Sequence, residues 1–526
     1  MDPNEEGKGG KTDVTSLVKL SSVEYLSKLR LTNGSDAQSV HDLPKLVGSL
    51  GGGWLGYSKK LIPVMDEDQK DDDECFPPRI SDWISVGTFP SPFKTNPAHY
   101  SLGGSFVSDT ETILVDIIAH QRRETLSREF LRCGPRDPIA FHPATVKAAI
   151  VTCGGLCPGL NTVIRELFNT LKHLYGVDNV WGIPYGYRGF YATNMHHMKL
   201  TEEKVAHIHH QGGTILGSSR GGFDLEVILN SIMDFGYNQV YIIGGDGTHR
   251  GAIKIFEETR KRGLKISVVG IPKTIDNDIA LIDKSFGFDT AVEEAQRAIN
   301  SAKVEALSGI NGVGLVKLMG RSSGYIAMFS TLASRDVNIC LIPEVSFCLE
   351  GPNGVFQHLQ EVLETKGHAV VVVAEGAGMD LLSKEQPTTV VDASGNPKLP
   401  DVGLWLKDKI NQHFKSQEME INLKYIDPTY MIRTVPANAS DSLYCGLLGQ
   451  SAVHGAMAGY TGYTVGLINT HFVMIPMPEI ANRGRVSVDV TSRMWNRVIA
   501  TTGQPDFHDH SCERPVSIQR KVTYST

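Results

Sequence analysis

Two short stretches of this chain are dense in groups that bind phosphate and divalent cations. Residues 244–248 read GGDGT, and residues 272–278 read PKTIDND. Glycine amides can approach phosphate oxygens closely, and aspartate oxygens are ligands that Mg²⁺ prefers. A carboxylate beside the metal can also accept a proton from an attacking hydroxyl. The two stretches therefore indicate a magnesium-dependent phosphoryl-transfer site.

The residues before each stretch predict its place in the fold. Aliphatic runs over residues 239–243 and 266–271 are typical of buried parallel strands. Loops at the carboxyl ends of such strands line the ligand site of open α/β sheets. In an extended segment Asp276 and Asp278 alternate through Asn277, so both carboxylates are expected to point the same way. Ordinary Asp- and Asn-rich turns are the alternative, disfavoured because two such loops follow strands in close succession.

Two glycine-rich turns upstream add phosphate-binding potential. Residues 153–161 read CGGLCPGLN and lie between an expected strand and an expected helix, an arrangement that holds phosphate at a helix N-terminus. They match neither GxxxxGK[ST] nor GxGxxG. Residues 212–222 read GGTILGSSRGG, where Arg220 offers a planar fork to phosphate oxygens. A plain tight turn and a surface arginine stay open as interpretations of these two segments.

The order of elements favours an α/β fold with doubly wound, largely parallel sheets. Strand and helix patterns alternate over residues 146–375, which is typical of parallel sheets with helices on both faces. We expect residues 1–145 to form a partly disordered N-terminal extension, although a helix is expected over 112–122. Residues 146–475 are expected to form the catalytic region, and residues 476–526 a C-terminal segment.

Composition narrows the class of function. The chain has 526 residues and a formal net charge of −7, so no basic surplus points to nucleic acid. No apolar run reaches the roughly 18 residues that span a bilayer. Its eight cysteines are scattered, and Cys153 and Cys157 are expected to be reduced thiols rather than a regulatory pair. The first residues resemble neither a secretory signal nor a transit peptide, so the expected location is the cytoplasm.

Seven motifs follow one another along the chain from about residue 146 to about residue 470: GGLCPGLN, YGYRGF, GGDGTHRGA, PKTIDNDI, MGRSSGYIA, AEGAG and YMIR. In these the chain resembles the 6-phosphofructokinases, and most closely the plant-type ATP-dependent enzymes related to the pyrophosphate-using branch. The resemblance implies two Rossmann-like subdomains and Mg²⁺-assisted, in-line transfer of the ATP γ-phosphoryl group to the 1-hydroxyl of fructose 6-phosphate. That reaction is a committing step of glycolysis. It also implies a homo-oligomer, dimer or tetramer, with no nucleic-acid or membrane partner.

The resemblance assigns a role to each motif residue. Nucleotide binding is implied for Gly154, Gly155, Arg220, Gly221, Gly245, Asp246, Gly247 and Thr248. Substrate binding is implied for Thr274, Ile275, Asp276, Met319, Gly320, Arg321, Glu375, Tyr430, Met431, Ile432 and Arg433. Catalytic roles fall to Asp276 as proton acceptor and to Arg220, Arg321 and Thr274. Asp246 and Asp278 are the expected metal ligands.

Two positions bear on the phosphoryl donor. The pyrophosphate-using relatives carry a second aspartate where this chain has Gly247, and its charge would repel the α-phosphate of ATP. Lys273, however, is the residue that those relatives use, whereas bacterial ATP enzymes have glycine. We expect ATP, with a pyrophosphate-dependent enzyme as the alternative. A lipid or NAD kinase would not need the downstream motifs, and a silent regulatory subunit is disfavoured because Asp246 and Asp276 are both present.

One departure from the bacterial pattern concerns oligomer contacts. Bacterial relatives place an arginine of a neighbouring subunit at the site from just before the MGR turn, where this chain has residues 311–314. Lys317 is a candidate substitute. The effector-site arginines of the bacterial enzymes find no clear match.

Overall fold

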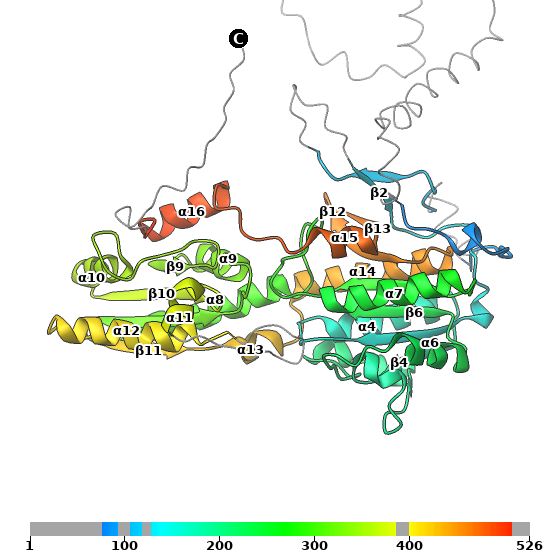
Figure 1. Cartoon of the computed structure of the whole chain (residues 1–526), viewed down its shortest axis with the longest axis horizontal. Helices are drawn as coiled ribbons and strands as arrows, with labels where there is room; N and C mark the ends of the chain where they lie inside the picture. The colour runs from blue at the N-terminus through cyan, green and yellow to red at the C-terminus, as the bar shows by residue number, and fades with distance from the viewer. Residues whose placement is uncertain (1–75, 93–105, 118–127, 386–398, 508–526) are drawn as a thin grey trace, which may run out of the picture. The chain divides into compact units, whose positions relative to one another are not determined.

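The computed structural model describes residues 76–92, 106–117, 128–385 and 399–507, whose strands form two sheets (Figure 1). The smaller sheet is parallel throughout, the larger sheet is parallel at its centre and antiparallel at its sides, and both carry helices on both faces, so the predicted α/β, doubly wound class is confirmed. Most of the predicted N-terminal extension, including its expected disorder, lies outside the described residues.

The larger sheet has nine strands in the order β1-β2-β13-β12-β7-β6-β3-β4-β5. Its central strands run parallel and are almost completely buried, as their unbroken aliphatic sequences require. They are β3 (Lys147–Thr152), β4 (Asn179–Ile183), β6 (Gln239–Gly244), β7 (Ser267–Pro272) and β12 (Tyr463–Ile468). The antiparallel strands at its two sides are β1 (Thr112–Leu114), β2 (Glu129–Arg132), β13 (His471–Pro476) and β5 (Met198–Lys199).

The smaller sheet has four parallel strands in the order β11-β8-β10-β9. Its strands are β8 (Gly312–Leu318), β9 (Ile339–Leu341), β10 (His368–Ala374) and β11 (Asn422–Ile426). β8 and β10 pair along their whole length and are buried apart from His368.

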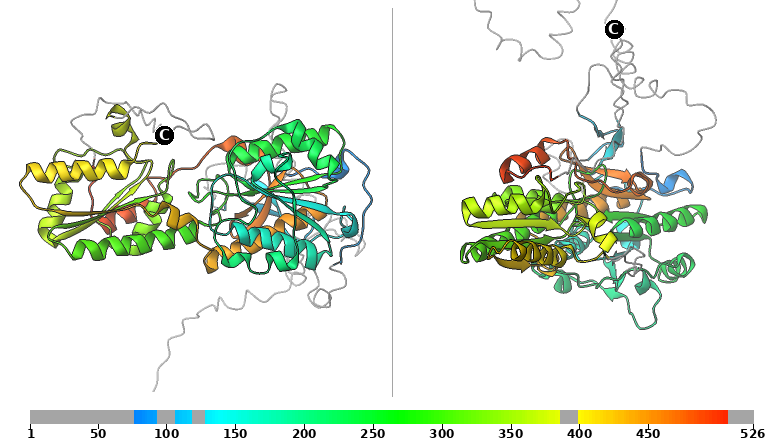
Figure 2. Two further views of the ribbon diagram at one scale, coloured as in Figure 1. Left: turned by 90° about the horizontal axis from the view of Figure 1, so that it is seen from below. Right: turned by 60° about the vertical axis from the view of Figure 1, so that its left-hand side comes forward.

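Alternate residues of each central strand face different helices, as the two-residue period of a strand dictates. In β3, Ala148 and Ile150 pack in the core that contains α4 (Leu160–Asn169) and α14 (Ala439–Met457). Ala149 and Val151 pack instead with α6 (Leu225–Asp234) and α7 (Asp246–Lys261). Figure 2 shows helices on both sides of the strands. Two short helices, α5 (Glu202–Val205) and α15 (Met477–Arg483), also belong to the part of the chain built on the larger sheet.

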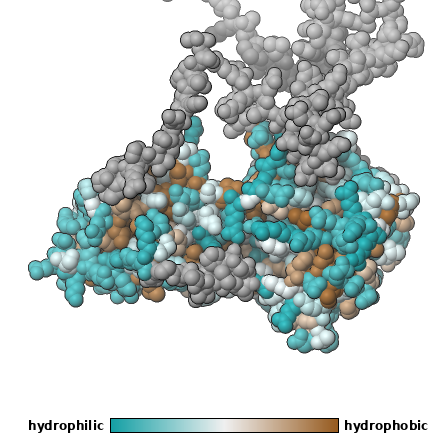
Figure 3. Space-filling view, in the orientation of Figure 1, coloured by the Kyte–Doolittle hydropathy of each residue, from teal (hydrophilic) through white to brown (hydrophobic). Residues whose placement is uncertain are grey.

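The smaller sheet is covered in the same way. α8 (Phe288–Leu307), α9 (Tyr325–Ser334) and α16 (Arg493–Thr502) share one core with the inner residues of β8 and β10. α10 (Val355–Lys366), α11 (Met379–Glu385) and α12 (Val402–Ser416) share another core on the opposite face. α13 (Thr429–Arg433) contacts α8. The face seen in Figure 3 is largely hydrophilic with scattered apolar patches, since the aliphatic strands lie inside.

The helix expected over 112–122 is wrong. Thr112–Leu114 form β1 and pair antiparallel with β2, and residues 118–127 lie outside the described part. β2 in turn pairs with β13 and buries Phe130 and Leu131. Residues assigned to the extension thus complete the larger sheet, while the boundary at residue 146 stays a prediction. No helix in the described ranges is long and apolar enough to cross a membrane.

Candidate active site

Three loops leave neighbouring strands at one edge of the larger sheet. Gly244 of β6 pairs with Pro272 of β7, and the Lys273 amide donates a hydrogen bond of 3.0 Å to the Gly244 carbonyl. On the other side of β6, the Cys153 amide donates to the Ile243 carbonyl at 2.8 Å. GGLCPGLN, GGDGT and PKTIDND therefore begin side by side at strand ends, as predicted.

The GGDGT loop passes directly into a helix. α7 begins at Asp246, and no side chain caps its first turn. The first amides of a helix without a side-chain cap are available to an anion. A side chain at Gly244 would collide with Thr248, because a Cβ there would lie 2.5 Å from it. Around Gly247, by contrast, a Cβ would meet nothing within 4 Å.

The PKTIDND loop is a turn and not the extended segment expected. Asn277 adopts a left-handed backbone with φ of 56°, which Asn tolerates better than most residues. The Thr274 hydroxyl donates to Asp278 Oδ1 at 2.7 Å and accepts the Asp276 amide at 3.2 Å. The two carboxylates are nonetheless close enough for the charge of Asp278 to raise the pKa of Asp276.

Asp276 lies in surroundings unlike those of an ordinary surface aspartate. Its Oδ1 atom is inaccessible to solvent and finds no hydrogen-bond partner within the described residues. The pKa of Asp276 is raised to about 7, chiefly by burial and also by the carboxylates of Asp278 and Glu375, whereas the charges of Arg485 and Lys273 act to lower it. A carboxyl with a pKa near neutrality is suited to general acid–base catalysis.

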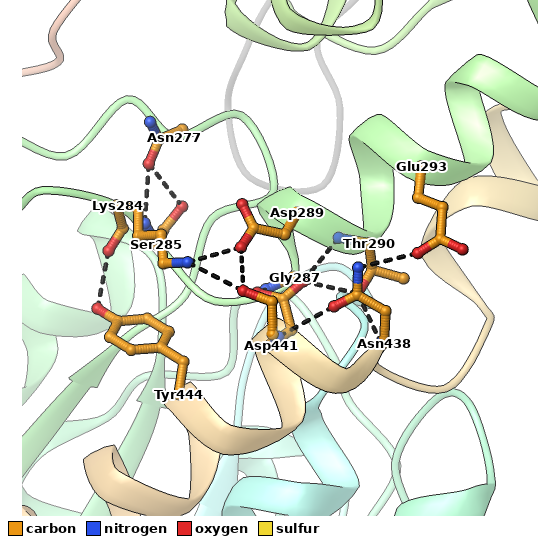
Figure 4. A network of polar contacts seen from close by, with 11 residues as sticks. Asn277, Lys284, Ser285, Gly287, Asp289, Thr290, Glu293, Asn438, Asp441 and Tyr444 are labelled. Atoms are coloured by element: carbon orange, nitrogen blue, oxygen red, sulfur yellow. Dashed lines mark hydrogen bonds and ion pairs between the residues drawn. The ribbon is translucent and has the colours of Figure 1, made fainter. Parts of the chain in front are cut away.

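A polar network fixes the chain that follows this loop (Figure 4). Asp441, in the first turn of α14, accepts the Gly287 amide at 2.9 Å and both the amide and hydroxyl of Thr290 at 2.7 and 2.6 Å. The Asn277 side chain accepts the Ser285 amide at 2.8 Å. α8 and α14 thereby hold the chain on the C-terminal side of the PKTIDND loop.

The carboxylates of Asp246 and Asp278 meet at one guanidinium group. Arg485 Nε donates to Asp246 Oδ2 at 3.1 Å and lies 3.6 Å from Asp278 Oδ2. Sequence reasoning missed Arg485, since it stands in the C-terminal segment, outside every motif and more than two hundred residues from either aspartate.

A cavity of about 680 Å³ joins residues predicted for the nucleotide and for the sugar phosphate. Gly154, Gly155 and Arg220 line it together with Arg433. A Cβ on Gly154 would lie 3.6 Å from the Lys273 ammonium, so Lys273 also borders this region. The cavity wall is made of bare glycine backbone and two cations, a combination that suits a phosphorylated ligand.

The lining of this cavity also includes parts of the second glycine-rich turn. These are Gly212, Gly213, Thr214, Gly217 and Ser218. Gly212 must be glycine, because a Cβ there would lie 1.6 Å from the Thr434 carbonyl oxygen. This close approach brings the turn against the YMIR segment.

The predicted sugar-side residues gather around the end of β8. The Glu375 amide donates to the Leu318 carbonyl at 2.9 Å, and Gly320 takes a φ of 127° in the MGR turn. Burial raises the pKa of Glu375 against the opposing charges of Lys317 and Arg321, which places Arg321 within electrostatic reach of Glu375.

The members of the YMIR segment differ in accessibility. Ile432 is completely buried, and Ile275 of the other loop is 6% exposed, so their side chains belong to the core. Tyr430 and Met431 are 71% and 70% exposed. The Arg433 guanidinium lies 4.8 Å from the centre of the Tyr430 ring, a distance typical of a cation–π contact.

Lys317 is not available to replace the arginine that a neighbouring subunit contributes to the site in the bacterial relatives. It is nearly buried in β8, and its ammonium pairs with Asp401 at 2.9 Å and Asp427 at 2.8 Å. Cys153 and Cys157 are buried free thiols whose pKa is raised to about 12 by burial, and their reduced state in the cell stays a prediction.

Comparison with known proteins agrees with this geometry. Residues 147–456 match the family model described as Phosphofructokinase. ATP-dependent 6-phosphofructokinase 7 of Arabidopsis thaliana is 57% identical, over 82% of this chain and 88% of that protein. ATP-dependent 6-phosphofructokinase of Borreliella burgdorferi is 47% identical, over 77% of this chain and 93% of that protein. The crystal structure of the pyrophosphate-dependent phosphofructokinase from Marinobacter aquaeolei has the same fold, with a TM-score of 0.56 at 18% identity over 68% of this chain and 91% of that chain. The chain belongs to the phosphofructokinase family.

Proposed function

We propose that this protein transfers the γ-phosphoryl group of ATP to the 1-hydroxyl of fructose 6-phosphate, giving fructose 1,6-bisphosphate and ADP. The observation that carries the proposal is the buried Oδ1 of Asp276, which has no hydrogen-bond partner among the described residues and lies beside loops suited to phosphate binding. Relatives at 47–57% identity are named ATP-dependent 6-phosphofructokinases. The catalytic region is residues 146–475.

In this mechanism Asp276 accepts the proton of the attacking hydroxyl. Its inaccessible Oδ1, which accepts no hydrogen bond from the described part of the chain, can accept one from a substrate hydroxyl, and a pKa of about 7 lets the carboxylate take the proton near neutrality. Thr274 holds the neighbouring Asp278, while Arg220, on the cavity wall, faces the charge that develops on the phosphoryl group. Arg321, Glu375 and Arg433 hold the sugar phosphate, with Tyr430 aligning Arg433.

The carboxylates present fit a magnesium ion that arrives with the nucleotide. Asp246 Oδ2 and Asp278 Oδ2 both lie within 3.6 Å of one cationic atom, so the pair already accommodates a positive charge. Among the described residues no group of three or more acidic, histidine or cysteine side chains forms a metal cage. Mg²⁺ usually takes one or two carboxylates and completes its shell with phosphate and water. When bound, it would neutralise the charge of the transferring phosphates.

ATP is the donor that the geometry favours. The space beside Gly247 is open, so the GGDGT loop can admit the α-phosphate. Lys273 is buried next to Gly154, where it can serve either donor. Gly247 therefore selects ATP as the phosphoryl donor, because no carboxylate at this position repels the α-phosphate.

We also propose a homo-oligomer, dimer or tetramer, that acts in the cytoplasm. Val304, Leu307 and Ile310, at the end of α8, are 63%, 55% and 72% exposed, and apolar residues gathered in this way are typical of subunit interfaces. Two of the Arabidopsis relatives are named chloroplastic, so a fluorescent fusion of the full chain decides between cytoplasm and plastid.

The test is a pair of initial-rate assays. Fructose 1,6-bisphosphate is measured from fructose 6-phosphate and Mg²⁺, with ATP in one assay and pyrophosphate in the other. We expect activity with ATP and none with pyrophosphate. Activity with pyrophosphate alone would assign the chain to the other branch, and inactivity with both donors would contradict the proposed function.

A further inference from the structure

Residues 485–488 form a strap that runs past the candidate active site. The strap lies beyond residue 456, where the match to the family model ends. It follows α15 and precedes α16 in the chain. No residue of it belongs to any motif that indicated the reaction.

Backbone contacts fix the strap on both sides. Arg485 forms an isolated β-bridge with Ile279, and the Val486 amide donates to the Asp278 carbonyl at 2.9 Å. At its other end the Val488 amide donates to Glu344 Oε1 at 2.7 Å. Glu344 also accepts the amide of Gly324, just before α9, at 2.9 Å. The strap thus ties the PKTIDND loop to the turn that contains Arg321.

These contacts place the guanidinium of Arg485 between two carboxylates. Its Nε lies 3.1 Å from Asp246 Oδ2 and 3.6 Å from Asp278 Oδ2, and its terminal nitrogen donates to Ser322 Oγ at 3.2 Å. Burial alone would lower the pKa of Arg485, but the carboxylates of Asp246, Asp278 and Asp276 outweigh it and raise that pKa. The group therefore carries a full positive charge at any working pH.

The two carboxylates repel each other when no cation separates them. Asp278 is 8% exposed in its side chain and Asp246 34%, so solvent screens them only in part. A cation between the two is therefore favourable, and in this structure the arginine provides it.

We propose that Arg485 is a built-in counter-cation that competes with a divalent metal for Asp246 and Asp278 in the free enzyme. The inference rests on the proposed function, because it takes these aspartates as the metal ligands. Bare metal then binds the free enzyme weakly, since it must displace a guanidinium that is held by the strap. Metal that arrives with nucleotide brings phosphate oxygens, to which a displaced guanidinium can donate.

A purely structural role predicts something different. If Arg485 only tied the strap to the loops, its removal would loosen Asp246 and Asp278 and weaken metal binding. Competition predicts tighter binding, because one positive charge leaves the immediate vicinity of both ligands. The direction of the change in metal affinity separates the two roles.

The experiment titrates Mn²⁺ into the full-length enzyme without nucleotide or sugar and follows free Mn²⁺ by electron paramagnetic resonance. We expect Arg485→Met to lower the Kd for Mn²⁺ by about tenfold. The matched control is Arg483→Met. Arg483 stands two positions before Arg485 and pairs with Glu479, so this variant removes the same charge from a different ion pair and should leave the Kd for Mn²⁺ unchanged. An unchanged or higher Kd in Arg485→Met, or no binding by either protein, would overturn the proposal.

A second measurement covers the case in which Arg485→Met folds poorly. Arg485→Lys keeps the charge and should bind Mn²⁺ much as the wild type does, whereas Arg485→Gln should bind it more tightly. Added Mn²⁺ should also raise the Tm of Arg485→Gln more than that of Arg485→Lys, since tighter binding to the folded state stabilises it more. Equal rises would count against competition. None of these measurements depends on catalytic turnover. If the wild type were inactive but the Arg485 variants without the charge still bound Mn²⁺ more tightly, the proposed function would be contradicted and the competition by Arg485 would stand.

Discussion

The GGDGT and PKTIDND loops begin at paired residues of neighbouring strands, yet they present their aspartates in opposite ways. Asp246 opens a helix, is partly exposed and already contacts a cation. Asp276 sits in a turn with an inaccessible oxygen that has no partner in the described structure. The same residue type at the same sheet edge is thereby placed in two different environments, which fits the roles proposed for them: charge pairing at Asp246 and proton acceptance at Asp276.

The difference lies in what surrounds each carboxyl group. The first turn of a helix stabilises a negative charge, so it keeps the Asp246 carboxylate ionised, as the metal ligand proposed for this position must be. Burial beside Asp278 disfavours the negative charge of Asp276 and raises its pKa to about 7 from 3.8. The folded protein then holds this proton more tightly than the unfolded chain does. The carboxyl therefore adds stability at low pH that is lost as the pH rises through about 7.

The largest effect is expected from removing the proton acceptor. Asp276→Asn keeps the shape and takes away the basic oxygen, so kcat should fall by about a thousandfold. Steady-state rates of fructose 1,6-bisphosphate formation measure it, with KM values near those of the wild type. The control is Asp283→Asn, an exposed aspartate of the same connection that accepts the Asn469 and Thr470 amides. A variant that keeps more than a few percent of wild-type turnover at unchanged substrate affinity would remove Asp276 as the base.

A second change tests what makes the GGDGT loop a nucleotide site. Gly247→Asp places a carboxylate in open space, so the protein should fold normally while kcat/KM for ATP falls by about a hundredfold through repulsion of the α-phosphate. Gly247→Ala adds bulk without charge and should keep most of the activity. If the alanine variant loses as much as the aspartate variant, space and not charge selects the donor.

A smaller effect is expected inside the PKTIDND loop. Thr274→Val removes the hydroxyl that donates to Asp278 at 2.7 Å and accepts the Asp276 amide. The free energy of unfolding should fall by about 1–2 kcal/mol, because the acceptor is charged and largely buried. Thermal unfolding of Thr274→Val and Thr274→Ser measures it, and the serine variant should behave like the wild type. Equal destabilisation of both would mean that the methyl group, and not the hydroxyl, supports the loop.

The two central strands β6 and β7 could be predicted from the sequence because they are short, mostly aliphatic runs that end at Gly244 and at Pro272. Such runs are buried in any parallel sheet, so residues 239–243 and 266–271 needed no knowledge of their neighbours. Edge strands were harder. The local sequence of β1 predicts a helix, but pairing with β2, which lies further along the chain, decides its conformation.

The site shows the same limit. Motifs placed the three loops together, because parallel strand ends share an edge. The turn at Asn277 was missed, since its left-handed backbone is fixed by bonds to residues further along, such as Ser285. Arg485 was missed because only the folded chain brings it to Asp246, and nothing in its local sequence marks it.

The pH dependence of kcat/KM for fructose 6-phosphate, at saturating ATP and Mg²⁺, tests the division of roles between the loops most directly. The base acts only when deprotonated, so a pKa of about 7 for Asp276 predicts an acid limb with its midpoint near pH 7 and a tenfold loss per pH unit below it. A profile that stays flat down to pH 5 would contradict the account, because it would show that the proton acceptor has the pKa of an ordinary exposed carboxylate.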